Sequence, residues 1–148
     1  SGGVVTRFSN VIGNGMSKNN VLSEILKQLS GKDPLTIRNI KPIRDFIWID
    51  DVVDAIVSLL QKDTSGIYNI GTGVETSINK LIETVLNVSE QHGRKIKSTI
   101  KNPDYSYSVL NVEQIKKVTV WKPKYTLSQS LKKILNSNEK KNHSSFYR

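Results

Sequence analysis

The sequence predicts an α/β fold in which short strands alternate with amphipathic helices. Two strand-to-helix transitions support this prediction: the apolar run FIWI (46–49) precedes a helical pattern over 52–60, and GIYNIG (66–71) precedes another over 78–86. In both helices the apolar residues recur at spacings of three and four, which is the period of one helix face. Strands and helices that alternate along a chain are typical of α/β or α+β folds.

The remaining elements follow from the same signals in chain order. Apolar β-branched runs bounded by glycine or proline predict strands, and i, i+3, i+4, i+7 apolar spacing predicts helices. FIWI has no polar alternation, so we expect that strand to be buried on both faces. The expected strands are VVTRFSNVI (4–12), PLTI (34–37) and KIKSTI (95–100), and the expected helices are NVLSEILKQLS (20–30), NVEQIKKV (111–118) and TLSQSLKKIL (126–135).

Local polar patterns predict how several of these elements begin. Asp51 and Asp54 have the spacing of a capping box, as do Asn111 with Gln114 and Thr126 with Gln129. Asp50 or Asp51 is therefore expected to cap the helix that follows FIWI. The glycines of NIGTG (69–73) are interpreted as a strand-to-helix turn that needs positive φ, because Thr76 stands where a dinucleotide fingerprint has its third glycine.

Composition limits the classes of protein to be considered. The chain of 148 residues can bury a core, contains no cysteine, and has no apolar run near the ~20 residues that span a membrane. Disulfides, thiol nucleophiles and cysteine metal sites are thereby excluded. His92 and His143 stand apart in the sequence, so no metal site is expected. A cytoplasmic protein without a membrane partner is favoured.

The charge and the two ends of the chain are unusual. The net charge is +9, with −1 over residues 1–93 and +10 over residues 94–148. We interpret this as a solvated lysine-rich surface; nucleic acid is not favoured as a partner, because aromatic residues that could stack on bases are sparse. Residues 1–3 are expected to be an added leader, and residues 136–148 a disordered basic tail.

Three polar residues lie where ligands commonly bind. Asn10 follows a strand, at the end where α/β folds place ligand-binding residues, and Asn20 lies at a helix start, where free N–H groups attract anions. Arg44 stands directly before a buried strand. Each also has an ordinary explanation: a turn or cap asparagine, or an arginine that pairs with Asp45.

Five segments, in this order and spacing, resemble the C-terminal half of the extended short-chain dehydrogenase/reductase (SDR) family, the NAD-dependent nucleotide-sugar epimerases and dehydratases such as UDP-glucose 4-epimerase. The resemblance covers about residues 4–135 and implies the C-terminal, nucleotide-sugar-binding portion of a Rossmann-type fold, with most of the Rossmann sheet absent. The segments are TRFSNVIGNG (6–15), NNVLSEILKQLSGKDPLTI (19–37), RDFIWIDDVVDAI (44–56), GIYNIGTGVETSI (66–78) and WKPKYTLSQSLKKIL (121–135).

The resemblance implies roles for individual residues. Those matched to substrate-binding positions are Asn10, Asn20, Val21, Arg38, Arg44, Lys101 and Asp104, and those matched to the nicotinamide side are Phe8 and Ser9. Arg44 would hold the diphosphate and Asp104 the ribose hydroxyls, with Asp45 orienting Arg44. Lys101 stands where the family has a second phosphate arginine, which predicts looser geometry. Arg38 stands where some members stack an apolar side chain on the base.

The resemblance also shows what this chain lacks. It contains no complete G-x-G-x-x-G, and none of its tyrosines has a lysine four residues later, although that Tyr-x-x-x-Lys pair carries the family's catalysis. The resemblance therefore implies an inactive fragment of an isomerase-type enzyme of polysaccharide biosynthesis. Its parent would use NAD and a UDP- or dTDP-sugar, whereas no cofactor is expected on the fragment.

Two further expectations follow. A stand-alone binding or interaction module without catalysis is the alternative to an enzyme fragment. If the N-terminal Rossmann half is missing, the strand VVTRF (4–8) should expose apolar faces and an unpaired edge. We then expect self-association or pairing with the missing half.

Overall fold

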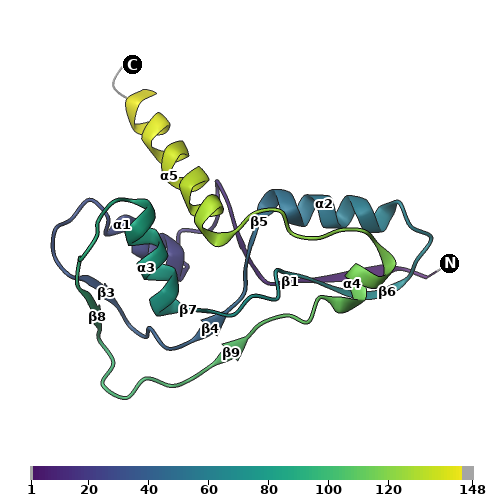
Figure 1. The fold of residues 1–148 in the computed structure, drawn as a ribbon, viewed down its shortest axis with the longest axis horizontal. Coiled ribbons are helices and arrows are strands. Elements are labelled where there is room, and N and C mark those ends of the chain that lie inside the picture. The colour runs from purple at the N-terminus through teal and green to yellow at the C-terminus, as the bar shows by residue number, and fades with distance from the viewer. Residues whose placement is uncertain (1, 145–148) are drawn as a thin grey trace.

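The computed structural model describes residues 2–144, with side chains as far as Ser137. Figure 1 shows an elongated molecule with helices near both ends and the helix α5 projecting from its middle. In chain order the elements are β1 (Val4–Phe8), β2 (Asn10–Ile12), α1 (Val21–Lys27), β3 (Leu35–Ile37), β4 (Ile43–Arg44), β5 (Phe46–Trp48), α2 (Ile49–Leu60), β6 (Gly66–Ile70), β7 (Thr76–Ser77), α3 (Ile78–Val88), β8 (Ile96–Ser98), β9 (Tyr107–Ser108), α4 (Glu113–Val118) and α5 (Leu127–Ser144).

Two hydrophobic cores lie on either side of the strand β5. One core joins α1, α3, α5 and β3, and the other joins α2, β6 and α4. Phe46 and Trp48 belong to the first core, whereas Ile47 belongs to the second. Because alternate side chains of a strand point to opposite faces, β5 serves both cores at once. The expected burial on two faces is confirmed for Phe46–Trp48, whereas Ile49 begins α2 and is 38% exposed.

The strands form small ladders rather than one wide sheet. The pairs β1–β6, β2–β5 and β3–β8 are parallel, and β4 lies between antiparallel β7 and parallel β9. Figure 1 shows β4, β7 and β9 in the region between the helical ends. The expected strand over 4–12 is divided, because Val4–Phe8 pairs with β6 and Asn10–Ile12 pairs with β5.

The start of α2 differs from the prediction. The helix begins at Ile49 with Trp48 at the N-cap position, and no side chain caps it. The side chain of Asp50 accepts a hydrogen bond of 2.8 Å from Trp48 Nε1 instead. The predicted cap at Asp50 or Asp51, and the predicted Asp51–Asp54 capping box, were therefore wrong. Both aspartates lie in the first turn, where a helix favours negative charge.

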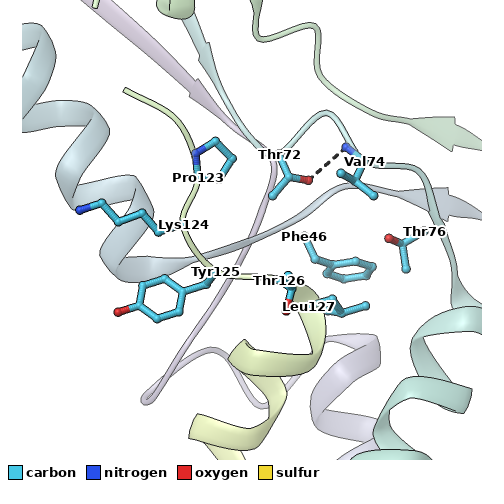
Figure 2. A pocket seen from close by; sticks show the side chains of 9 residues that line it. All are labelled: Phe46, Thr72, Val74, Thr76, Pro123, Lys124, Tyr125, Thr126 and Leu127. Atoms are coloured by element: carbon cyan, nitrogen blue, oxygen red, sulfur yellow. Dashed lines mark hydrogen bonds between the residues drawn. The ribbon is translucent and has the colours of Figure 1, made fainter. Parts of the chain in front are cut away.

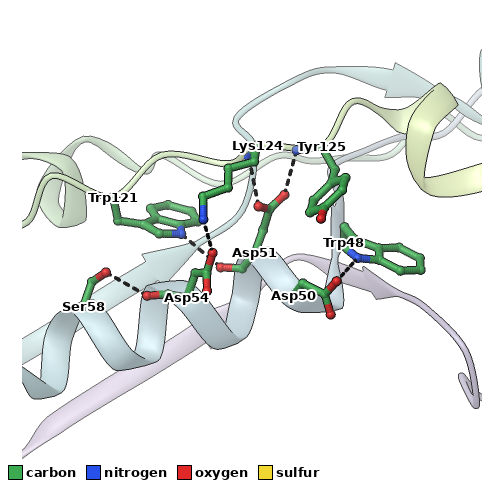
Figure 3. A network of polar contacts seen from close by, with 8 residues as sticks. All are labelled: Trp48, Asp50, Asp51, Asp54, Ser58, Trp121, Lys124 and Tyr125. Carbon is green, nitrogen blue, oxygen red and sulfur yellow. Dashed lines mark hydrogen bonds and ion pairs between the residues drawn. The ribbon is translucent and has the colours of Figure 1, made fainter. Parts of the chain in front are cut away.

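The carboxylate of Asp51 instead holds a distant loop, as Figure 3 shows. Its oxygens accept hydrogen bonds from the main-chain N–H groups of Lys124, at 2.9 Å, and Tyr125, at 3.1 Å. The Asp51 main-chain oxygen accepts a third bond, of 3.0 Å, from Trp121 Nε1. Asp51 is fully buried. It therefore joins α2 to the segment that leads into α5.

Of the two other predicted capping boxes, one is present before α5 and one is absent before α4. Thr126 and Gln129 form the expected reciprocal capping box before α5, with bonds of 2.9 Å and 3.3 Å between main chain and side chain. Before α4, Val112 takes the N-cap position, and Asn111 Oδ1 accepts from the N–H of Glu113 rather than of Gln114. The capping box expected at Asn111 was wrong in its partner.

The helix α5 continues past residue 136, where we expected an irregular tail to begin. It runs through Ser144. Helical periodicity in the sequence ends earlier because the apolar residues stop, although a polar segment can extend a helix that tertiary packing has already started. The rest of the expected tail, 145–148, lies outside the described residues, as does Ser1 of the expected leader.

Several large apolar side chains of β1, β6 and α2 are exposed. Val5 on β1 pairs in register with Ile67 on β6, and their exposures are 55% and 47%. Parallel ladders are normally covered on both faces. Apolar residues of α2 are exposed as well. The exposed apolar residues of β1, β6 and α2 are Val4, Val5, Phe8, Ile49, Val53, Val57, Leu60 and Ile67. The expected exposure of the first strand is confirmed, while self-association stays a prediction.

No helix within residues 2–144 combines the length and the apolar character that crossing a membrane requires.

The end of α3 contains a strained residue that allows a stability test. Glu90 adopts φ 58°, and the next residue, Gln91, donates its N–H to the Leu86 oxygen at 2.9 Å, as in a helix stop that favours glycine. We expect Glu90→Gly to raise the free energy of unfolding by about 0.5–1 kcal/mol, measured as a shift of the urea midpoint. Gly93→Ala, at φ 76°, should lower it. A destabilising Glu90→Gly would contradict the expectation.

Candidate functional site

Arg44 lies on β4 and is held by three hydrogen bonds to its own chain. Its Nη1 donates to the main-chain oxygens of Ile43, at 2.8 Å, and Ser106, at 3.1 Å. Its Nη2 donates to Ser106 Oγ at 2.8 Å. The side chain is half-buried. The guanidinium is thus fixed in place at the border between β4 and the segment that leads into β9.

That segment runs beside β3 and β4 and brings four predicted residues into neighbouring positions. Arg38 accepts from the N–H of Ile100 at 3.1 Å through its main-chain oxygen, which places it next to Lys101 in the chain. Asp104 accepts at 2.8 Å from Asn39 Nδ2 through its main-chain oxygen. The side chains of Arg38, Lys101 and Asp104 are exposed. Together with Arg44 they line two adjacent segments, 38–44 and 101–106.

Asn10 belongs to the same region. At the start of β2, its N–H and its Nδ2 both donate to the main-chain oxygen of Asp45, at 2.9 Å and 3.0 Å. It is directly opposite Phe46 in the β2–β5 ladder. Asn10 therefore lies beside the Asp45–Phe46 peptide, and its amide oxygen accepts no hydrogen bond from the described residues.

Asn20 and Val21 lie at the start of α1. Asn20 is the N-cap of this helix: its Oδ1 accepts from Ser23 N at 2.9 Å, and its Nδ2 donates to the Ser17 oxygen at 2.6 Å. It also lines a cavity of about 320 Å³ together with Val11 of β2. Strand β2 thus links Asn20 to Asn10, although no hydrogen bond joins Asn20 or Val21 to the other predicted site residues.

Asp45 does not orient Arg44, contrary to the prediction. Its fully buried carboxylate accepts from the N–H of Thr72, at 3.0 Å, from Thr72 Oγ1 at 2.5 Å, and from the N–H of Gly73, at 3.0 Å. Asp45 therefore anchors the strand-to-helix turn after β6. Arg44 takes its support from Ser106 instead, since the two residues alternate to opposite sides of the chain.

The two glycines of that turn have different requirements. Gly73 has φ +72°, as the sequence predicted. Gly71 has no positive φ, but a Cβ there would overlap Asp45 Oδ2 and would lie 3.2 Å from Ser9 Oγ. Gly71 is thus needed for close approach to the Asp45 carboxylate.

Phe8 and Ser9 lie at the carboxyl end of β1. Phe8 is exposed to 45%, whereas Ser9 Oγ is buried and has no hydrogen-bond partner among the described residues. These two residues alone do not make a dinucleotide site, because the chain contains no glycine-rich fingerprint. Within the described residues no group of three or more His, Cys, Asp or Glu could hold a metal; the side chain of His143 lies outside them.

Two side-chain hydrogen bonds to carboxylates raise the pKa of their donors. Tyr107 of β9 donates a hydrogen bond of 2.7 Å to the Glu75 carboxylate, and this bond raises the pKa of the phenol above its ordinary value. Lys124 Nζ donates to Asp54 at 2.6 Å, which raises the pKa of the ammonium group. The Tyr107–Glu75 bond joins β9 to the loop before β7, and these two strands flank β4.

A separate cavity of about 290 Å³ lies beside the two buried aspartates. Figure 2 shows the turn at Thr72 and the segment from Pro123 on either side of Phe46. Asp45 binds the turn at Thr72, which forms one wall of the cavity. Asp51 binds the segment at Lys124, which forms the opposite wall. None of the predicted substrate residues lines it. Its lining residues are Phe46, Thr72, Val74, Thr76, Pro123, Lys124, Tyr125, Thr126 and Leu127.

The sequence reasoning missed Ser106, which contacts Arg44 through both its main chain and its side chain. The strand that places it, β9, is two residues long, Tyr107–Ser108, and carries no alternation that a pattern could detect. The repeated Tyr-Ser pairs at 105–108 were the available signal, because aromatic and β-prone residues favour strands.

Comparison with known proteins shows what this chain is similar to. The sequence profile of the NAD dependent epimerase/dehydratase family matches residues 2–71. A dTDP-4-dehydro-6-deoxyglucose reductase of Escherichia coli is 28% identical over 139 residues, which are 88% of this chain and 43% of the relative. This chain spans less than half of the curated relatives that it matches.

Solved structures agree with the sequence matches. RMD from Pseudomonas aeruginosa, complexed with NADPH, superposes with a TM-score of 0.81 at 28% identity, covering 93% of this chain and 48% of that one. UDP-glucose 4-epimerase from Thermotoga maritima, with UDP-glucose, gives a TM-score of 0.79 at 25% identity, covering 94% and 46%. The chain is therefore similar to the NAD dependent epimerase/dehydratase family over residues 2–71, and most of its length superposes on these two solved structures.

Proposed function

We propose that this chain forms the nucleotide-sugar-binding portion of an NAD-dependent epimerase, dehydratase or reductase, and that it binds the diphosphate of its ligand through Arg44. The observation that carries the proposal is the arrangement around Arg44. Asn10, Arg44 and the segment 101–106 lie on adjacent strands or segments, and the guanidinium is held by Ser106 at a half-buried position.

The chemistry of these residues suits a nucleoside diphosphate. A guanidinium can donate two parallel hydrogen bonds to phosphate oxygens, and such charge-assisted bonds are the strong class. Lys101 adds a second positive charge nearby, and Asp104 supplies a carboxylate that can accept from ribose hydroxyls. Arg38 offers a planar surface on which a base could stack. Substrate contacts of Asn20, Val21, Phe8 and Ser9 are part of the same proposal.

Hydride chemistry on the sugar would need groups that this chain does not contain. Its sequence has no Tyr-x-x-x-Lys and no complete dinucleotide fingerprint. NAD or NADPH would supply the hydride exchange in a complete enzyme, and we propose that this chain alone is inactive and binds no cofactor. The exposed apolar residues of β1, β6 and α2 are where an N-terminal Rossmann half would pack. A cytoplasmic location stays a prediction.

A stand-alone binding module is the second candidate. The observation that favours it is that this chain has two cores of its own, yet lacks the residues for catalysis. Both candidates predict the same ligand. They differ in whether adding the Rossmann half of a relative restores turnover of a UDP- or dTDP-sugar.

Arg44→Ala tests the proposal directly. We expect the affinity for UDP, dTDP or GDP, whichever the unchanged chain binds best, to fall about thirtyfold or more, because bonds from a charged donor to phosphate contribute about 1.5–3 kcal/mol each. Isothermal titration calorimetry at fixed low salt is the measurement.

Arg7→Ala is the matched control. Arg7 is an exposed arginine on β1, so this change removes the same charge without touching β4. Binding should change less than twofold, which is roughly the effect of one distant screened charge. Equal losses in the two variants would mean that net charge, rather than Arg44, determines binding. No binding of any of the three nucleotides would overturn the proposal.

A further inference from the structure

Ser106 occupies an unusual place beside Arg44. Its main-chain oxygen accepts both from Ile43 N, at 2.8 Å, and from Arg44 Nη1, at 3.1 Å. Its Oγ accepts from Arg44 Nη2 at 2.8 Å. A hydroxyl that accepts one bond still has its own proton to donate. Within the described residues, the Ser106 hydroxyl proton has no acceptor.

The guanidinium of Arg44 also has N–H groups that donate to none of the described residues. Its three bonds use both protons of Nη1 and one proton of Nη2. Nε–H and the second Nη2–H remain without an acceptor within the described residues. Because Ser106 Oγ lies 2.8 Å from Nη2, its hydroxyl proton can point toward the same space as that Nη2–H. Three donors of these two neighbouring residues thus make no hydrogen bond with the described residues and are left for a ligand.

We propose that Ser106 is a direct ligand of the diphosphate and the positioning residue of Arg44; this inference rests on the proposed function. The hydroxyl donates to a phosphate oxygen while its Oγ keeps the guanidinium in place. A hydroxyl that is polarised by an adjacent cation is a better donor, and a guanidinium held in advance loses less conformational freedom on binding.

The surrounding contacts keep Ser106 in place without the ligand. Ile43 pairs with Tyr107 and Arg44 with Ser108 in the parallel β4–β9 ladder. Asn39 Nδ2 donates to the Asp104 oxygen at 2.8 Å, two residues before Ser106, and the Tyr107 hydroxyl donates to Glu75 at 2.7 Å just after it. The segment is fastened on both sides of Ser106, so the hydroxyl is presented by fixed main chain.

Ser106→Ala should lower the affinity for UDP about tenfold at fixed salt, measured by titration calorimetry, because one bond to a charged phosphate is lost. The loss should be equal for inorganic pyrophosphate, since the contact is with the phosphates. Ser106→Thr keeps the hydroxyl and should restore affinity to within about threefold of the unchanged chain.

Ser108→Ala is the matched control, because Ser108 lies on β9, two residues after Ser106, is exposed, and its hydroxyl makes no hydrogen bond with the described residues. Its affinity should be unchanged. If Ser106→Ala binds UDP normally while Arg44→Ala does not, the role of Ser106 is overturned and the proposed function stands. If Ser108→Ala loses as much as Ser106→Ala, a general disturbance of β9 explains both. If the unchanged chain binds neither UDP nor pyrophosphate, both proposals fail.

Discussion

Asp51→Asn is expected to lower the free energy of unfolding by about 2–3 kcal/mol, although it changes one atom of a side chain. Both carboxylate oxygens of Asp51 accept from main-chain N–H groups in a fully buried position. The amide of asparagine would place an N–H donor against one of those N–H groups, which leaves two buried donors facing each other. Urea unfolding with a fixed m value measures the loss.

Asp54→Asn is the control for this change. Asp54 lies one turn further along the same helix and pairs with Lys124, the residue whose N–H Asp51 also binds, but its side chain is 44% exposed. An exposed ion pair contributes little, so Asp54→Asn should cost far less than Asp51→Asn. Hydrogen exchange at the Lys124 and Tyr125 amides should accelerate in Asp51→Asn alone. Equal destabilisation by both variants would contradict the role of Asp51.

Gly71→Ala should cost about 2–3 kcal/mol of stability, because the added methyl group would overlap a buried carboxylate. The Asp45 oxygen concerned also accepts from Gly73 N at 3.0 Å, so relief of the overlap would stretch or break that bond. Since Asp45 follows Arg44 directly, we expect binding of UDP to weaken as well. Thermal or urea unfolding and calorimetry measure the two effects separately.

Two comparisons isolate the cause of that loss. Gly73→Ala meets only left-handed strain, with Val112 Cγ2 at an ordinary 3.5 Å, and should cost about 1 kcal/mol. In an Asp45→Ala background the overlap is absent, so the extra cost of Gly71→Ala should largely disappear. A Gly71→Ala that is milder than Gly73→Ala, or equally costly with and without Asp45, would refute the explanation.

The sequence was informative wherever the decisive interactions lie within one element. The helix face of α3 follows from the spacing of Ile78, Leu81, Ile82 and Val85, all of them buried. FIWI predicted a strand with both faces buried because an apolar run has no polar face to expose. The Thr126–Gln129 capping box needs only a separation of three residues. Such local signals also assigned the α/β character of the chain.

The predictions at Asp45 and Asp51 were wrong for the opposite reason. Their partners lie 27 and 73 residues further along the chain, and the groups that they bind are main-chain N–H groups, which every non-proline residue possesses. No residue type marks such a partner in a sequence. A local explanation, an ion pair or a helix cap, was therefore the natural but incorrect interpretation.

For the candidate site, the sequence placed Arg44 at the start of the buried strand, whereas the structure places it at the end of β4, with Asp45 between it and β5. The sequence could not supply the parallel register that sets Ser108 opposite Arg44 and brings Ser106 to the guanidinium. Register in ladders of two residues depends on neighbouring loops rather than on side-chain alternation. The substrate roles of the site residues stay predictions until binding is measured.

The contacts of Asp51 also bear on the order of folding. Its bonds to Lys124 and Tyr125 connect positions 73 and 74 residues apart, so forming them closes a long loop at an entropic cost that short-range contacts avoid. Such contacts tend to form after the nearby helices and strands have assembled. Interactions that are absent from the folding transition state act mainly on the rate of unfolding. We therefore expect the junction between α2 and the segment before α5 to form late and to govern how long the folded chain persists.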